Sequence, residues 1–274
     1  EAFGDDKQFC KRLRGHRDKN FEVQILKGLS ILSSSQPIKA FSAFQVNKNG
    51  RQMVSDEVAC EAAYRFFIDR KLVATVSVSP ADLEDYAVGH VVTDGFLAFK
   101  EIAGVNIDES EIHVHSKTGV AGGDRPPRDI PPIDSALQIS ERQALSCAGS
   151  LSSFASHWQR TGGLHIAVLF NRHSELIQAA EDVGRHNAVD KVVGYAFKNG
   201  HNLSECFLVC SGRQPEDMVA KIARAGIPVV ISRAATTDRG IALADKVGLT
   251  LIGFAREDRF TIYTHPGRLI KFSL

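Results

Sequence analysis

The chain contains 274 residues, of which 43% are hydrophobic and 24% are charged, and its formal net charge is +1. This balance argues against a general attraction to nucleic acid or to anionic membranes, and no apolar run is long enough to span a bilayer. The five cysteines are scattered and odd in number, which argues against a secreted disulfide framework. The first residues are acidic, unlike a signal peptide. We therefore expect a cytoplasmic protein without nucleic-acid or membrane partners.

The first half of the chain divides into an arm and a β-rich domain. Residues 1–50 predict no regular element and are interpreted as a loosely structured arm. Residues 51–135 predict a smaller β-rich α+β domain. It ends in a long loop, residues 117–134, where glycine and proline oppose both helix and central strand. Long loops of this kind are usually functional or mobile.

Local patterns predict the elements of this β-rich domain. Residues 64–68 and 72–78 are rich in β-branched and aromatic side chains and predict a hairpin. Ser79 and Pro80 then predict the start of a helix, with Ser79 as its N-cap. Residues 112–115 predict a further short strand.

Residues 136–274 predict a C-terminal α/β domain. A helix is expected at 140–160, where apolar residues recur at helical spacing. The chain then alternates between strands expected at 166–170, 206–210, 229–231 and 249–253 and helices expected at 187–197, 215–225 and 239–247. Alternation implies a mainly parallel sheet with helices on both faces. Ligands bind such sheets at the carboxyl ends of the strands.

Residues 181–191 carry an unusual density of polar groups. A solvated helix face spaces its charges every three or four residues, whereas these lie almost consecutively. One interpretation is that Arg185 and His186 contact an anionic ligand or the loop at 119–123, with Asp190 orienting one of them. The other is a structural network that caps the following helix through Asn187. Both interpretations remain open.

Arginines follow three consecutive predicted strands. Arg213 lies in a Ser-Gly-Arg turn before a helix, and Arg233 occupies the equivalent place one strand later. Arg256 and Arg259 follow the next strand. Backbone amides at helix N-termini and guanidinium groups bind anions, so this edge predicts a site for a phosphate-rich ligand. Ordinary solvent-exposed turns are the alternative.

Several motifs, in this order and spacing, resemble the formate dehydrogenase accessory sulfurtransferases, the FdhD family. The resemblance covers about residues 55–270 and rests on the segments 80–84, 94–97, 161–165, 181–191, 211–213, 232–237 and 248–254. It implies that the C-terminal domain has a three-layer fold like that of cytidine deaminases. It also implies a homodimer that receives sulfur from a cysteine desulfurase and serves formate dehydrogenase.

The resemblance further implies a cargo, the guanine-dinucleotide form of the molybdenum cofactor (bis-molybdopterin guanine dinucleotide). The segment matching residues 254–259 contacts this cofactor in the family. The expected cofactor-binding residues are Ser211, Gly212, Arg213, Ser232, Arg233, His165, Arg185, His186, Phe254, Ala255, Arg256, Glu257, Asp258 and Arg259. They would hold its guanosine and diphosphate.

The expected sulfur site departs from the family pattern. Family members carry Cys-Gly-x-Cys-Gly in the central loop, where a thiolate accepts sulfur as a persulfide. The matching residues are Thr118, Gly119, Val120, Ala121 and Gly122. Neither threonine nor alanine can hold a persulfide, so Cys147 is the fallback carrier. The alternative function is a cofactor-binding chaperone that has lost sulfur transfer.

Zinc-dependent deamination is the least supported function. Zinc deaminases need His-x-Glu and a later Pro-Cys-x-x-Cys. Here Ala167 stands two residues after His165, and Cys210 is followed by Ser-Gly-Arg. We therefore expect no zinc, and we interpret Cys206 and Cys210 as core residues.

Overall fold

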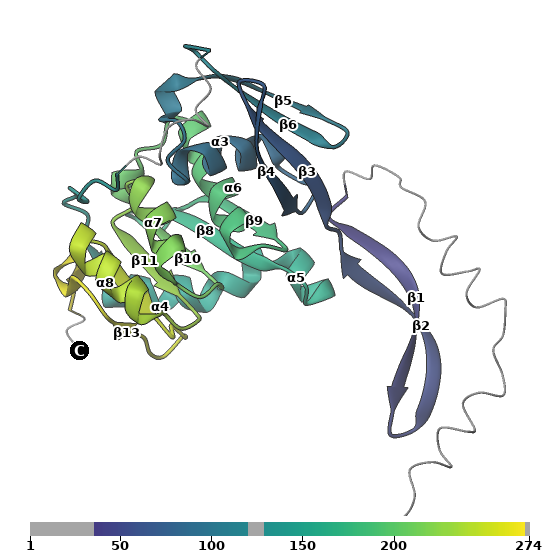
Figure 1. Cartoon of the computed structure of the whole chain (residues 1–274). Coiled ribbons are helices and arrows are strands. Elements are labelled where there is room, and N and C mark those ends of the chain that lie inside the picture. The colour runs from purple at the N-terminus through teal and green to yellow at the C-terminus, as the bar shows by residue number, and fades with distance from the viewer. Residues whose placement is uncertain (1–35, 120–128, 272–274) are drawn as a thin grey trace, which may run out of the picture. The chain divides into compact units, whose positions relative to one another are not determined.

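The computed structural model describes residues 36–119 and 129–271, in which helices pack against β-sheets (Figure 1). The largest sheet has six strands in the order β13-β12-β11-β10-β8-β9. These strands are β8 (His165–Asn171), β9 (Leu176–Asp182), β10 (Cys206–Cys210), β11 (Val229–Ser232), β12 (Thr250–Gly253) and β13 (Thr261–Ile262). Strands β10, β11 and β12 are parallel, and all other neighbours are antiparallel. The sheet is mixed, so the prediction of a mainly parallel sheet is wrong.

Strand β9 accounts for part of this error. A tight turn joins it to β8, and a connection this short permits only antiparallel pairing. Its sequence, LIQAAED, is mostly small or polar and lies half exposed. The period-2 pattern that identifies a strand is therefore weak in this segment.

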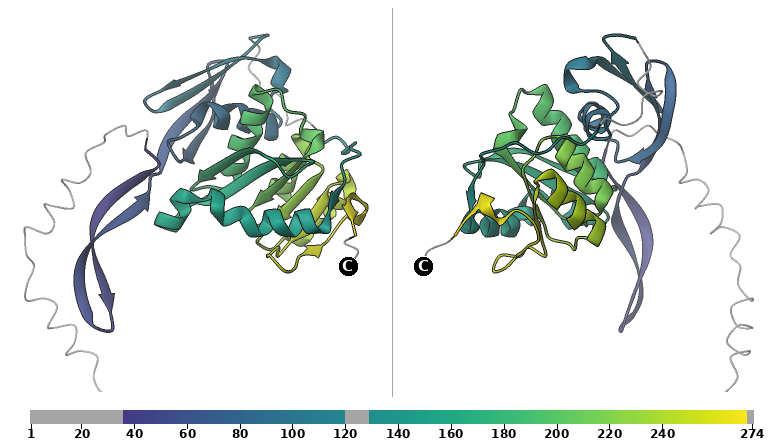
Figure 2. Two further views of the ribbon diagram at one scale, coloured as in Figure 1. Left: turned by 180° about the vertical axis from the view of Figure 1, so that it is seen from behind. Right: turned by 60° about the vertical axis from the view of Figure 1, so that its left-hand side comes forward.

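Helices cover both faces of the six-stranded sheet (Figure 2). Helices α6 (Arg185–Lys198), α7 (Glu216–Arg224) and α8 (Asp238–Val247) pack on one face, and α4 (Glu141–Ser150) with the 3₁₀ turn η3 (Leu151–Phe154) packs on the other. Strand β10 serves both cores, since Leu208 faces the first group of helices whereas Phe207 and Val209 face the second. Cys206 and Cys210 are buried in the first core, as expected. The predicted arrangement of a sheet between two helical layers is confirmed.

The single helix expected at 140–160 is broken into α4, η3 and α5 (Ser156–Thr161). The Ser150 hydroxyl donates a hydrogen bond to the Cys147 carbonyl, and the Ser153 hydroxyl donates one to the Ser150 carbonyl. Such bonds compete with regular helix geometry. Ala155 then leaves the helical conformation, with φ −109° and ψ 57°. The break sets the direction of α5, which forms one wall of the pocket described below.

The N-terminal part contains a four-stranded sheet in the order β4-β3-β6-β5. Its strands are β3 (Ala62–Ile68), β4 (Lys71–Val78), β5 (Ile102–Asp108) and β6 (Glu111–Ser116), and α3 (Leu83–Thr93) packs on one face. The predicted β3–β4 hairpin is confirmed. Helix α3 begins after Asp82, so the prediction that Ser79 is its N-cap is wrong. The Ser79 hydroxyl instead accepts a hydrogen bond from the Val183 amide.

A long hairpin, β1 (Ile38–Asn47) and β2 (Gly50–Ala59), begins where the sequence predicts only an unstructured arm. Its apolar residues Phe41, Val46 and Met53 are exposed, so hydrophobic burial gives little signal there. The hairpin is linked to α5 by an ion pair between Glu57 and Arg160. Short elements complete the described fold: β7 (Ile139–Ser140), β14 (Leu269–Ile270), η1 (Phe99–Glu101), η4 (Leu203–Glu205) and η5 (Pro266–Arg268).

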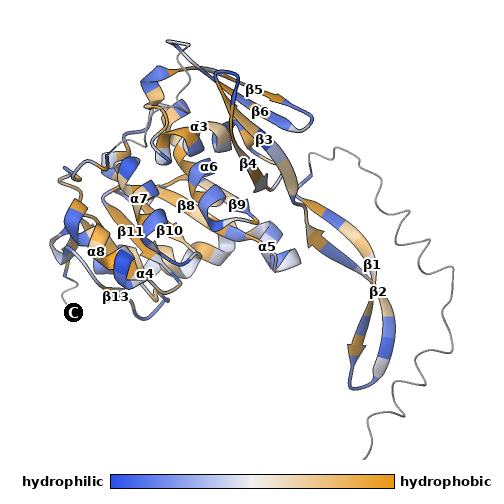
Figure 3. Ribbon diagram, in the orientation of Figure 1, coloured by the Kyte–Doolittle hydropathy of each residue, from blue (hydrophilic) through white to orange (hydrophobic). Residues whose placement is uncertain are grey.

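Hydrophobic residues concentrate in the central strands β8, β10 and β11, whereas β1 and β2 mix both kinds of residue along their length (Figure 3). The hydrophobic strands are also the buried ones, because every residue of β10 and β11 is buried. Within residues 36–119 and 129–271, none of the helices combines the length and hydrophobicity that a bilayer crossing requires.

Helices α3 and α6 approach each other at two glycines. A Cβ atom on Gly89 would lie 1.8 Å from the carbonyl oxygen of Asp190, and one on Gly194 would lie 1.9 Å from that of Asp85. Both distances are far below van der Waals contact, so only glycine permits this crossing. The crossing joins the N-terminal sheet and its helix to the C-terminal domain.

Candidate functional site

Several strand ends meet at one edge of the six-stranded sheet. Because β8 is antiparallel to β10, the start of β8 at His165 lies beside the end of β10, and the Ser211 amide donates to the Ile166 carbonyl. His165 also pairs with Asp182 at the end of β9. The turn that follows β11 begins at Arg233 on the same edge. Residues from four separate segments are thereby brought together.

A pocket of about 510 Å³ opens at this edge. Its volume lies in the range of small-molecule sites. The lining residues are Leu151, Ser152, Ala155, Trp158, Gly162, Gly163, Leu164, His165, Ile166, Val183, Ser211 and Arg233. Of the predicted cofactor-binding residues, the structure therefore brings His165, Ser211 and Arg233 into one pocket.

His165 and Ser211 form the polar centre of the pocket. His165 Nδ1 lies 3.2 Å from Ser211 Oγ, which also accepts a 3.0 Å hydrogen bond from the Ile166 amide. Burial lowers the pKa of His165, and the positive charges of Arg185 and Arg213 lower it further. His165 is therefore a neutral imidazole at pH 7, a hydrogen-bonding group rather than a fixed cation.

Arg185 is the first residue of helix α6 and lies beside this pocket. Gly212 allows its approach, since a Cβ there would lie 2.7 Å from Arg185 Cβ. The Arg185 Nε atom is buried without a hydrogen-bond partner among the described residues. An unpaired buried donor is costly, and the helix N-terminus adds positive potential at the same place. This corner of the site is thus prepared for an anion.

His186 contributes less charge than the sequence suggests. Its Nε2 lies 3.1 Å from Asp217 Oδ2, outside hydrogen-bond geometry. Burial lowers the pKa of His186 more than the nearby Asp217 raises it. The contact is therefore that of a neutral imidazole with an exposed carboxylate.

The turns after β10 and β11 are held together by structural hydrogen bonds. The buried Ser232 hydroxyl donates to the Gly212 carbonyl at 2.7 Å and accepts from the Ala234 amide. Gly212 and Ser232 thereby fix the turns that carry Arg213 and Arg233. Arg213 is exposed.

The segment 254–259 is hydrogen-bonded to the turn after β11. Ala255 is fully buried and its amide donates to the Ser232 carbonyl, while Arg256 Nη1 donates to the Arg233 carbonyl at 2.6 Å. Phe254 has φ 52° and its side chain is 47% exposed. A non-glycine residue in this conformation is strained. Glu257, Asp258 and Arg259 are exposed, and none of the segment lines the pocket.

The expected sulfur site lies only partly within the described residues. Val120, Ala121 and Gly122 fall outside them. Thr118 and Gly119 are exposed at the end of β6, where the Gly119 amide donates to Ser116 Oγ at 3.1 Å. Neither residue lines the pocket.

The fallback carrier Cys147 also lies away from the pocket. It is 5% exposed, and burial raises the pKa of its thiol, although a hydrogen bond with Ser174 opposes this effect. Ser174 belongs to the β8–β9 turn, at the opposite end of β8 from His165. Burial likewise raises the pKa of Cys206 to about 11 and that of Cys210 to about 12. Among the cysteines of the described ranges, Cys60 is partly exposed and the other three are buried.

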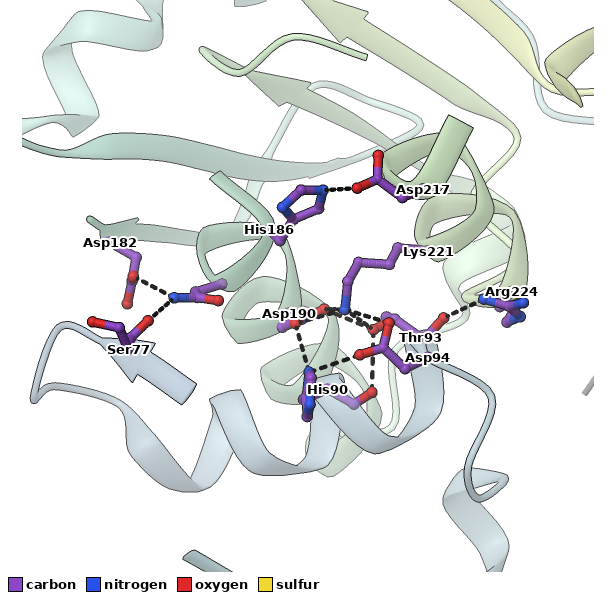
Figure 4. A network of polar contacts seen from close by, with 11 residues as sticks. Ser77, His90, Thr93, Asp94, Asp182, His186, Asp190, Asp217, Lys221 and Arg224 are labelled. Carbon is purple, nitrogen blue, oxygen red and sulfur yellow. Dashed lines mark hydrogen bonds and ion pairs between the residues drawn. The ribbon is translucent and has the colours of Figure 1, made fainter. Parts of the chain in front are cut away.

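The polar run at 181–191 is largely structural (Figure 4). Glu181 accepts the His157 and Trp158 amides at the start of α5. Asp182 and Lys191 form a 2.7 Å ion pair in which the side chains are 0% and 1% exposed. Here the network interpretation is correct for most of the run.

Asn187 and Asp190 serve this network in ways that the sequence does not predict. Asn187 does not cap α6 at its first residue, because it donates to Ser77 O and Asp182. Asp190 pairs with Lys221 at 2.9 Å and accepts from Thr93 at 2.7 Å. The prediction that Asp190 orients Arg185 or His186 is wrong. These bonds tie α6 to α3 and α7.

Sequence reasoning missed the apolar wall of the pocket. Trp158 on α5 lines the pocket and is 42% exposed, and Gly162, Gly163 and Leu164 continue the wall into β8. The segment 161–165 is one of the motifs that carry the family resemblance, but only His165 was expected to act. Within the described ranges, no three His, Cys, Asp or Glu residues lie close enough together to hold a metal ion.

The FdhD/NarQ family model matches residues 118–270 of this chain. The chain belongs to the FdhD/NarQ family. Family relatives extend the match well beyond that region. Protein FdhD of Methanocaldococcus jannaschii is 38% identical over 81% of this chain and 94% of its own length. The sulfur carrier protein FdhD of Methanothermobacter thermautotrophicus is 33% identical over 83% of this chain and 97% of its own length.

A solved structure agrees with the family assignment. The crystal structure of a protein from Desulfotalea psychrophila, described as a formate dehydrogenase accessory protein, superposes with a TM-score of 0.75 at 26% identity. It covers 86% of this chain and the whole of that chain. The family fold therefore includes both the N-terminal sheet and the pocket-bearing C-terminal domain.

Proposed function

We propose that this FdhD/NarQ family member is an accessory protein of formate dehydrogenase maturation that binds a nucleotide-bearing molybdenum cofactor and carries sulfur for it. The observation that carries the binding half is the pocket at the strand ends, which joins Arg233 to an apolar wall. The unpaired Arg185 Nε and the exposed Arg213 add donors close to it. A guanosine diphosphate moiety supplies both a flat aromatic heterocycle, whose faces suit the apolar wall, and anionic oxygens.

The resident groups suit a diphosphate. Guanidinium groups bind phosphate oxygens in pairs of parallel hydrogen bonds. His165 and Ser211 are neutral groups that can donate to or accept from the sugar or phosphate oxygens. The cofactor is cargo in this proposal, and these residues hold and orient it.

Sulfur carriage requires a thiol. A cysteine thiolate attacks the outer sulfur of a donor persulfide, the donor S–S bond breaks, and the donor leaves as its thiol while a new persulfide forms on the acceptor. This exchange is redox-neutral. Cys147, Cys206 and Cys210 are buried, which slows such chemistry. Cys60 is the cysteine of the described residues that remains partly accessible.

Isothermal titration calorimetry with GDP tests the binding half. Arg233→Ala should weaken GDP binding by about 1.5–3 kcal/mol, the cost of losing a charge-assisted hydrogen bond. Arg65→Ala is the matched control, because Arg65 lies in the N-terminal sheet and pairs with Glu111. Equal affinities of the wild type and the Arg233→Ala, Arg213→Ala and Arg185→Ala variants would reject the site.

Cyanolysis after incubation with a cysteine desulfurase tests sulfur carriage. We expect persulfide on the wild type, loss in Cys60→Ser, and no change in Cys147→Ser. Persulfide that disappears only in Cys147→Ser would contradict this assignment. A wild type that acquires no persulfide, but gains it in the Thr118→Cys/Ala121→Cys double variant, would identify a cofactor-binding chaperone without sulfur transfer.

A further inference from the structure

The pocket has a chemically mixed lining. Leu151, Ala155, Trp158 and Leu164 belong to its apolar part. Ser211 and Arg233 belong to its polar part, and the charges of Arg185 and Arg213 act on the adjacent His165. A ligand that is anionic throughout would leave the apolar residues unused. The lining instead fits a ligand that combines a flat aromatic ring with phosphates.

Trp158 differs from the other apolar residues of the lining. Among the lining residues that the structure describes, it is the one large aromatic side chain, and 42% of it is exposed, whereas Leu151, Ala155 and Leu164 are buried. An indole that is partly exposed at a pocket offers a π-face for stacking. Aromatic side chains bind nucleic-acid bases in this way.

The backbone that carries the indole is also fixed before any ligand binds. Both carboxylate oxygens of Glu181 accept backbone amides at the start of α5, from His157 at 3.0 Å and from Trp158 at 2.6 Å. At the other end, the Gly162 amide donates to the Trp158 carbonyl at 2.7 Å. Gly162 has φ 64°, which ends the helix there. The backbone that carries Trp158 is therefore preorganised, so stacking costs little additional entropy.

We propose that the Trp158 indole is the stacking surface for the heterocyclic base of the bound nucleotide, and that it sets the preference for a nucleotide over a bare diphosphate. This inference rests on the proposed function, because it assigns a residue to one half of the same ligand. Glu181 acts on the ligand through Trp158 and is a positioning residue.

The chain provides a specific probe, since Trp158 is its only tryptophan. Intrinsic tryptophan fluorescence therefore reports on this pocket alone. We expect GDP to change the intensity or wavelength of wild-type emission, and inorganic pyrophosphate to change it much less. Calorimetry should show GDP binding roughly tenfold weaker in Trp158→Ala, the scale of one lost base–aromatic stack. Pyrophosphate affinity should change less than about twofold, and Trp158→Phe should recover most GDP affinity.

Two controls separate the possible failures. Phe41→Ala removes an aromatic side chain of similar exposure, 45%, from the β1–β2 hairpin and should leave GDP affinity unchanged. If GDP binds the wild type and Arg233→Ala weakens it, but Trp158→Ala does not, the stacking assignment is overturned and the proposed function stands. If neither GDP nor pyrophosphate binds the wild type, the proposed function fails and the stacking assignment falls with it.

Discussion

The junction of α3, α6 and α7 and the pocket at the strand ends both draw on residues 181–191, but they use them differently. In the junction, charged groups are paired and almost fully buried, as in Asp182 with Lys191. Beside the pocket, Arg185 keeps an unpaired Nε and Arg213 is exposed. Paired buried charges fix one arrangement of helices, whereas unpaired donors leave capacity for a ligand. In this run, a residue whose polar atoms are all paired within the protein is structural, whereas a residue with an unpaired polar atom is a candidate for ligand binding. The density of polar residues in the sequence does not distinguish the two.

The largest expected effect comes from the helix crossing that supports the junction. Gly194→Ala would force a methyl group to within 1.9 Å of the Asp85 carbonyl oxygen, a backbone atom that cannot move alone. We expect a loss of about 4 kcal/mol or more in the free energy of unfolding, or failure to fold. Gly267→Ala is the control, because a Cβ there meets nothing within 4 Å. Urea denaturation measures both. Similar midpoints for the two variants would mean that the crossing is not as tight as described.

The buried ion pair should give the next largest effect. Lys191→Met leaves Asp182 buried with a negative charge and no cation, which typically costs about 3–5 kcal/mol. Lys198→Met also removes ion pairs, with Glu84 and Asp85, but Lys198 is 30% exposed. Partly exposed pairs contribute about 1 kcal/mol or less. Denaturation midpoints compare the two, and equal losses would show that burial does not govern the junction. Any folded Lys191→Met protein should still bind GDP, since Lys191 does not line the pocket.

The sequence predicts the central elements of the C-terminal domain well because burial is strong there. Residues 206–210 and 229–231 are continuous apolar runs, and the structure buries every residue of the corresponding strands. It fails at β9 and at the β1–β2 hairpin, where strands are half exposed or exposed. Pairing within each hairpin, rather than side-chain burial, holds these segments, so hydrophobic periodicity gives little signal there.

The candidate site is predictable to a similar extent. The structure brings His165, Ser211 and Arg233 together in one pocket, because the ends of the parallel strands β10 and β11 meet at one edge and the antiparallel β8 starts beside them. Trp158 could not be assigned from the sequence, since its place depends on the break between η3 and α5. Periodicity continues across that break and predicts one helix. The role of Asp190 depends on partners about 100 residues away, such as Thr93.

Arg185→Ala tests the pocket side of the comparison. The variant should weaken GDP binding by about 1.5–3 kcal/mol if the guanidinium contacts phosphate. Its stability should change little, since the unpaired Nε contributes no hydrogen bond to the folded protein. Calorimetry and thermal melting on the same sample separate these outcomes. A variant that loses stability but binds GDP normally once folded would place Arg185 with the structural residues of the run.

The smallest expected effect is a pH dependence of the junction, through His90. Burial lowers the pKa of His90, but its hydrogen bonds to Asp190 and Asp94 outweigh burial, so the pKa is raised above the usual value of 6.5 despite the nearby Lys221. The folded protein therefore holds this proton more tightly than the unfolded chain does. The stabilisation is fully present below the unfolded pKa and is lost as the pH rises through the folded pKa.

His165 and His186 have lowered pKa values and shift stability in the opposite direction, so the wild-type profile alone mixes these contributions. The useful quantity is the difference in free energy of unfolding between the wild type and His90→Gln, measured by urea denaturation from about pH 6 to about pH 9. We expect that difference to shrink steadily as the pH rises, since glutamine does not titrate. Thr93→Val serves as a comparison that removes a hydrogen bond to Asp190 without removing a titrating group. A difference that stays constant or grows with pH would mean that His90 is neutral in the junction, and that Lys221 alone balances Asp190 and Asp94.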